Sequence, residues 1–161
     1  LILEAGRVAP TAVNYQPQRI FALDSEENLA LVKSCTPYHF RAPLVLVVCY
    51  DIGTAWRNPA GDEMGIVDAS IVTAHMMLEA ANLGIGSTWV GHFDRAALRE
   101  AFHIPDFLIP VALLPLGYPS APNDAQQPLG YQRNRFLQFL RRRNAGRKAR
   151  LSALKTYKTT I

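Results

Sequence analysis

A short loop-like segment combines small residues and amides in a way suited to holding a flat, hydrogen-bonding ring. It reads Ala-Pro-Thr-Ala-Val-Asn-Tyr-Gln-Pro-Gln over residues 9–18. Asn14 carries both a donor and an acceptor for the polar edge of a ring. Thr11 and Ala12, the small residues after Pro10, let the backbone lie close to a ring face. The alternative is that Asn14 only satisfies its own turn, which is the commoner role of an isolated Asn in a loop.

A second segment, residues 83–94, reads Leu-Gly-Ile-Gly-Ser-Thr-Trp-Val-Gly-His-Phe-Asp. Its glycines do not form a phosphate-binding loop, because in such loops they follow a strand and open a helix, whereas these follow a helical pattern and lead into a strand. Gly84 is expected to end the helix, and Gly91 to allow a close approach of backbone to another group. A backbone N–H at Val90 or Gly91, next to Trp89, would then be aimed at a bound ring.

The remaining reactive side chains do not suggest a metal centre. The four histidines and two cysteines lack the spacings that hold zinc, so no metal site is predicted. Cys49 is expected to be core, His75 a packed or hydrogen-bonded helix residue, and His92 a loop residue at the rim of a pocket. Trp56 and Arg57 could reach over a substrate, although a solvated loop is an equally good interpretation.

These segments need a scaffold of helices and strands, which the apolar patterns supply. Asp24 with Glu27 has the form of a capping box. The run Leu44–Tyr50 is continuous and β-branched, as in a central strand, and residues 66–83 form a helix expected to be buried on most sides, as the spine of the domain or of a subunit interface. The order of elements indicates an α+β sandwich of helices on a mixed, mainly antiparallel sheet. The predicted helices are 1–8, 25–34, 66–83 and 94–102, the predicted strands 19–23, 44–50, 87–90 and 108–116, and 51–65 is a surface loop.

Composition limits the class of protein. The chain has 161 residues, of which 49% are hydrophobic, so one globular domain with its own core is expected. Residues 1–132 hold seven Lys and Arg residues and all 13 Asp and Glu residues, whereas residues 133–161 hold the other ten basic residues and no acid. We therefore predict an acidic domain over 1–132 and an atypical basic tail over 133–161. No apolar run is long enough for a membrane span, two cysteines fit a reducing cytoplasm, and a first residue that is not Met suggests a truncated start.

Together with the strand end Pro115-Leu-Gly-Tyr-Pro119, these segments resemble the nitroreductase family. Its members contain EAGRxAPSxxNxQPW, then GLGxxWVGxFD after a long helix, then PxGYP. The counterparts here are residues 4–18, 84–94 and 115–119, in the same order. The likeness covers roughly residues 1–132, and three ordered motifs are more specific than any one of them.

The resemblance implies an α+β homodimer with one FMN in each of two interface pockets. Pro10, Thr11, Ala12 and Asn14 match the family's loop that contacts the flavin from one subunit. Trp89, Val90 and Gly91 match the segment along the ring in the other subunit, where a backbone N–H stabilises the reduced flavin. The implied reaction is ping-pong: NAD(P)H reduces FMN, and a nitroaromatic, quinone or similar small-molecule acceptor then takes the electrons. Such a reaction needs no side chain as acid or base, so the resemblance implies no catalytic residue.

The sequence departs from the family at both ends. The family's RRSxRxF-like phosphate-binding stretch would fall about one helix before Leu1, so Arg133, in a segment similar to the family's PLHxKR, is the best remaining phosphate contact. After it the chain is basic throughout. One interpretation is that the tail is an amphipathic basic helix that binds nucleic acid or an anionic surface, and that the rest of the chain is a relic of a flavin domain. The other interpretation, which we favour, is that the reading frame has shifted near Gly130.

Overall fold

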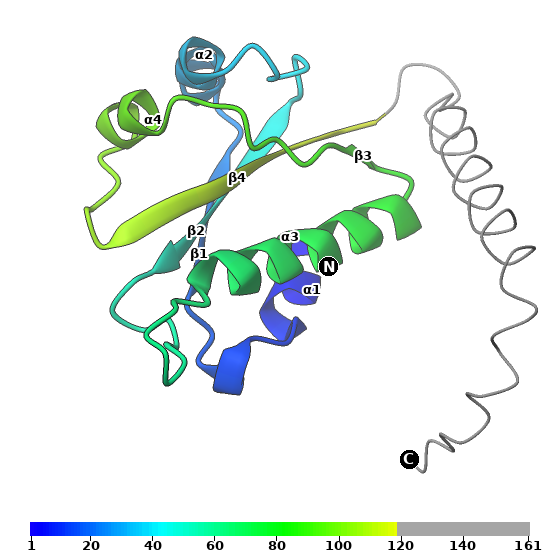
Figure 1. Ribbon diagram of the computed structural model, residues 1–161. Coiled ribbons are helices and arrows are strands. Elements are labelled where there is room, and N and C mark those ends of the chain that lie inside the picture. The colour runs from blue at the N-terminus through cyan, green and yellow to red at the C-terminus, as the bar shows by residue number, and fades with distance from the viewer. Residues whose placement is uncertain (119–161) are drawn as a thin grey trace, which may run out of the picture. The chain divides into compact units, whose positions relative to one another are not determined.

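A computed structural model describes residues 1–118 of the chain, as four α-helices, a short 3-10 helix and four strands (Figure 1). The expected domain boundary at residue 132 and the basic tail lie outside the described residues. The elements in chain order are α1 (Ile2–Val8), η1 (Ala12–Asn14), β1 (Gln18–Leu23), α2 (Glu26–Cys35), β2 (Leu44–Asp51), α3 (Gly65–Asn82), β3 (Gly86–Ser87), α4 (Arg95–Ala101) and β4 (Leu108–Gly117).

The strands form one sheet in the order β1-β2-β4-β3, and neighbours run antiparallel. Every strand pair among residues 1–118 is antiparallel, which agrees with the mainly antiparallel sheet of the predicted fold. β2 is central as predicted, with residues 45–50 all buried. The register shifts between Val48 and Cys49, where Val111 of β4 is left over as a bulge. The bulge keeps Val111 on the same face as Leu114 and Leu116.

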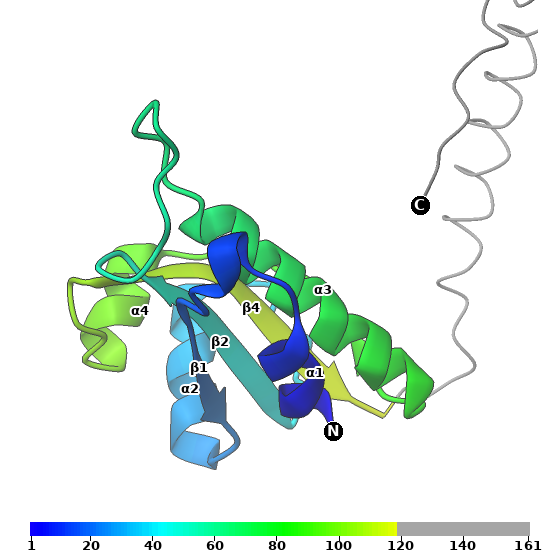
Figure 2. The ribbon, with the colours of Figure 1, turned by 90° about the horizontal axis from the view of Figure 1, so that it is seen from below.

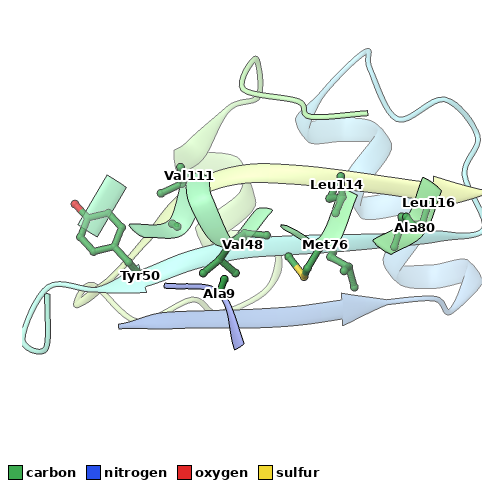
Figure 3. Close-up of a cluster of buried hydrophobic side chains, with 11 residues drawn as sticks. Ala9, Val48, Tyr50, Met76, Ala80, Val111, Leu114 and Leu116 are labelled. Atoms are coloured by element: carbon green, nitrogen blue, oxygen red, sulfur yellow. The ribbon is translucent and has the colours of Figure 1, made fainter. Parts of the chain in front are cut away.

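Helices cover both faces of the sheet. α1 and α3 lie on one face and α2 and α4 on the other, as Figures 1 and 2 show from two directions. Alternate residues of β2 point to the two layers. Leu46, Val48 and Tyr50 pack with α3, in the cluster that Figure 3 draws. Val45, Val47 and Cys49 pack with α2 and α4. Burying each such side chain contributes roughly 2 kcal/mol.

The helix ends are set by local side chains. Ser25, not Asp24, caps α2 by accepting a hydrogen bond from the Asn28 N–H at 3.2 Å, which corrects the predicted capping box. Asp94 caps α4 through the Ala97 N–H. Gly84, with φ of +72°, follows α3 in the left-handed region, which confirms that it ends the helix.

α3 is less buried than its composition predicts. Its inner stripe, which includes Val72 and Met76, is buried, but Ile66, Val67 and Leu78 are 57%, 44% and 71% exposed. The helix begins at Gly65, where a Cβ would come within 2.1 Å of the Tyr50 ring. α3 therefore has one apolar side in the core and another without a partner among residues 1–118. No helix in this range is long and apolar enough to cross a membrane.

Candidate functional site

The loop of Pro10, Thr11, Ala12 and Asn14 follows α1 and turns sharply. Val13, Asn14 and Gln16 have φ of 53°, 57° and 51°, in the left-handed region that non-glycine residues rarely adopt. Pro10 and Asn14 are exposed, whereas Thr11 and Ala12 are half-buried. Such a conformation persists only where neighbouring groups hold it, and here those groups are side chains.

Gln16 ties the loop together from inside. Its backbone N–H donates to Thr11 Oγ1 at 3.0 Å, and its side-chain amide donates to Asn14 Oδ1 at 2.9 Å and to the Ala9 carbonyl at 3.2 Å. The hydrogen bond to Asn14 Oδ1 lies within the same loop, as the alternative interpretation of Asn14 expects. With its oxygen engaged, its Nδ2 amide makes no hydrogen bond within residues 1–118 and can donate outward.

Asp68, in the first turn of α3, anchors the same loop. Its Oδ1 accepts the Ala12 N–H at 2.8 Å, across 56 positions of sequence, and the residue is 1% exposed. Its Oδ2 is buried without a hydrogen-bond partner in the described part of the chain. No sequence motif singled out Asp68 as part of the site. A signal was present, since Asp68 begins the inward stripe that continues with Val72 and Met76.

The second segment, Trp89–Gly91, is joined to the edge of β4. Val90 is buried, and its N–H and C=O pair with the C=O and N–H of Leu113, both at 2.9 Å. The Val90 N–H is therefore occupied, which removes one of the two donors proposed from the sequence. The Gly91 N–H makes no hydrogen bond among the residues described and remains the candidate.

Gly91 is the site of a close approach, as predicted, and the approaching group is Trp89. A Cβ on Gly91 would lie 2.6 Å from Trp89 Cζ3. The Trp89 ring is 40% exposed, so it covers the glycine on one side and meets solvent on the other. The segment thus offers a free N–H beside a flat aromatic surface.

An open pocket of about 350 Å³ adjoins this segment. Besides residues 88–92, it is lined by Tyr38 and Phe40, which belong to none of the sequence motifs. Tyr38 packs edge-on against His92, with ring centres 5.6 Å apart, and Thr36 Oγ1 donates to the His92 carbonyl at 2.7 Å. The position of His92 at a pocket rim is confirmed.

The two halves of the predicted site lie on opposite faces of the sheet. Ala9, which leads into the first loop, packs in the layer of α3 (Figure 3), and Val90 packs in the layer of α2 and α4. One copy of the described residues therefore does not bring Thr11 and Gly91 around the same ring. Arg133 lies outside the described residues.

The remaining candidates have structural roles. Arg57 forms an ion pair with Glu63 across a small hairpin, and His75 Nδ1 lies 2.9 Å from the Ile71 carbonyl, as expected of a hydrogen-bonded helix residue. Burial raises the pKa of the Cys49 thiol to about 12, in keeping with its predicted core position. Burial, with help from the Glu63 carboxylate, also raises the pKa of Tyr50 to about 12. Neither group lies in the two half-sites.

Comparison with known proteins agrees with this geometry. The model of the Nitroreductase family matches residues 31–118. The chain belongs to the nitroreductase family. A relative in Methanothermobacter thermautotrophicus, assigned as an NADH dehydrogenase or NAD(P)H nitroreductase, is 32% identical over 126 residues, which cover 74% of this chain and 64% of the relative.

Solved structures of the family share the fold. A nitroreductase family protein of Clostridium difficile matches with a TM-score of 0.75 and 32% identity, covering 99% of this chain and 84% of that one. An FMN complex of a Desulfovibrio desulfuricans protein matches with a TM-score of 0.66 and 28% identity, covering 75% and 72%. The chain spans less than two thirds of some curated relatives, such as 58% of an NADPH-dependent oxidoreductase of Staphylococcus aureus. The predicted family and the α+β fold class are confirmed.

Proposed function

We propose that this protein is an FMN-dependent oxidoreductase that passes electrons from NAD(P)H, by a ping-pong mechanism, to a nitroaromatic, quinone or similar acceptor. Membership of the nitroreductase family is the observation that carries the proposal. The names of relatives in Methanothermobacter and Staphylococcus, and the FMN complex from Desulfovibrio, agree with it. When bound, FMN supplies the hydride acceptor and electron carrier of the reaction.

The residues present fit the ring of FMN. Asn14 retains an amide donor on an exposed, well-held loop, which suits a carbonyl on the polar edge of the flavin. Gly91 retains a backbone N–H next to the Trp89 ring, which suits a ring nitrogen that gains negative charge on reduction. No side chain is required as an acid or a base, because the hydride passes directly between the nicotinamide and the flavin.

We further propose that two copies of the chain complete each site. The half-sites lie on opposite faces of one sheet, so a flavin in contact with both needs the loop of one copy and the Trp89–Gly91 segment of another. The outer side of α3, with Ile66, Val67 and Leu78 exposed, offers an apolar surface for such a pairing.

The aromatic pocket is the natural place for the second substrate. Tyr38 and Phe40 stand beside the flavin segment with 48% and 57% of their surfaces exposed. Flat, electron-poor rings such as quinones and nitroaromatics stack well on aromatic side chains. Tyr38 and Phe40 would therefore hold the acceptor against the flavin.

Titration of the purified chain with FMN tests the proposal. We expect flavin fluorescence to be quenched on binding, and the loaded protein to oxidise NADH or NADPH when menadione or nitrofurazone is supplied. Sedimentation over a range of concentrations should give a dimer that binds one FMN per chain. A colourless protein that oxidises neither nucleotide with either acceptor would overturn it.

A further inference from the structure

The loop between α2 and β2 lines two separate pockets with alternate side chains. Tyr38 and Phe40 line the aromatic pocket, whereas His39 and Arg41 line a second cavity of about 190 Å³. Phe40 and Arg41 have φ of 52° and 53°, so the backbone between the pockets is held in a strained conformation. No residue lines both pockets, and the second cavity is distinct from the flavin segment.

The second cavity has an apolar floor and a basic rim. Val32 of α2 and Val45 of β2, each 1% exposed, form part of the floor with Leu29, Ala42 and Pro43. The rim consists of Lys33, His39 and Arg41, and no acidic residue lines the cavity. A ligand that fits it must therefore combine an apolar body with negative charge.

The side chains at the rim have hydrogen-bond donors that are free to bind a ligand. His39 Nδ1 accepts the Arg41 N–H at 3.0 Å, which leaves the ring proton on Nε2 as a donor. Lys33 and Arg41 form no ion pair with a carboxylate within residues 1–118. A planar guanidinium and an ammonium beside one apolar cleft suit a carboxylate, which can accept from both.

The size of the cavity limits the ligand. Its volume of about 190 Å³ is below the range of roughly 300–1,000 Å³ that is usual for drug-sized ligands, which leaves room for one ring or a short chain. We propose that this cavity binds a small organic carboxylate, with its apolar end on Val32 and Val45 and its carboxylate on Lys33, His39 and Arg41. The site does not depend on the flavin.

Titration of the full chain, without FMN, with benzoate tests the site. Benzamide has nearly the same shape but no charge, and acetate has the charge but no ring. We expect amide NMR shifts to change around Lys33, His39 and Arg41, with benzoate binding at least about fivefold more tightly than benzamide or acetate. Equal binding of benzoate and benzamide would overturn the proposal, as would shifts confined to other parts of the chain.

Substitutions at the rim separate this site from general attraction of anions. Lys33→Ala and Arg41→Ala should each weaken benzoate about fivefold and leave benzamide unchanged, while Arg41→Lys should lose less. Arg7→Ala removes the same charge from α1, away from the cavity, and should have no effect. All of these positions are exposed, so the variants should fold; an equal loss in Arg7→Ala and Arg41→Ala would contradict a built site.

Discussion

The two half-sites, the loop from Pro10 to Asn14 and the segment from Trp89 to Gly91, are held by different means. The loop is held by side-chain hydrogen bonds, from the Ala12 N–H to Asp68 and from Gln16 to its neighbours. The segment is held by backbone pairing of Val90 with Leu113 and by the Trp89 ring lying on Gly91. The loop should therefore be sensitive to the loss of a hydrogen-bond acceptor such as the Asp68 carboxylate. The segment should be sensitive to a larger side chain at Gly91.

A branched side chain at position 91 should have the largest effect. In Gly91→Val the added Cβ would meet Trp89 Cζ3 at 2.6 Å, so either the ring or the backbone N–H must move. We expect FMN affinity to fall by about a hundredfold, equivalent to roughly 3 kcal/mol, in a fluorescence titration. Gly53→Ala is the control, because a Cβ there meets only its neighbour Asp51, at 3.2 Å. Normal affinity of Gly91→Val would show that the packing on Trp89 is unimportant.

Removal of the buried anchor should have the next largest effect. Asp68→Ala leaves the Ala12 N–H without its acceptor, so we expect the free energy of unfolding to fall by about 2 kcal/mol and FMN binding to weaken about tenfold. Asp68→Asn keeps an oxygen that can accept the same hydrogen bond and should lose less in both urea unfolding and FMN titration. Equal losses in the two variants would mean that the hydrogen bond to Ala12 is not what matters.

Loss of the outward amide of Asn14 should weaken FMN binding only about fivefold, because a neutral hydrogen bond is worth roughly 1 kcal/mol. Asn14→Asp keeps the oxygen that accepts from Gln16 but loses the donor, so it should weaken binding at least as much as Asn14→Ala. The unfolding midpoint reports any change in the loop itself. Wild-type affinity in Asn14→Asp would mean that the donor does not face the flavin.

Treatment of the native protein with a thiol reagent should have the smallest effect, because the core thiol of Cys49 should not react. Burial raises the pKa of Cys49 to about 12, above its ordinary value, so the thiol stays protonated at pH 8 and only the unfolded chain exposes a reactive thiolate. Iodoacetamide at pH 8 should leave Cys49 unmodified and FMN binding unchanged, by peptide mass analysis, until urea is added. Rapid native labelling would contradict the packing of β2 between the two layers.

Much of the scaffold could be predicted from the sequence because it depends on local pattern. The apolar run of β2 predicted a central strand, and the helical spacing from Ala69 to Ala80 predicted α3 to within a residue or two. The cap of α2 could not be decided, since Asp24 and Ser25 are adjacent and both suit the position. The exposed side of α3 could not be predicted either, because the same apolar sequence pattern is expected whether a helix packs against the core or against another copy of the chain.

The site was predictable only in its outline. The motifs identified the loop and the segment, but the anchor Asp68 acts from 56 positions away, and the pairing of Val90 with Leu113 exists only once β4 is in place. Tyr38 and Phe40 reach their pocket through an unusual backbone turn that no local pattern indicated. Each of these features is a consequence of tertiary structure.

The separation of the half-sites by a sheet has a consequence for inheritance. If each pocket takes its loop from one copy and its Trp89–Gly91 segment from the other, a chain damaged at Asp68 and a chain damaged at Gly91 can rescue each other. Random mixing of the two weakly binding variants should regenerate about a quarter of the pockets intact, all of them in mixed dimers. Two defective alleles expressed in one cell would then yield more activity, at low FMN concentration, than either yields alone.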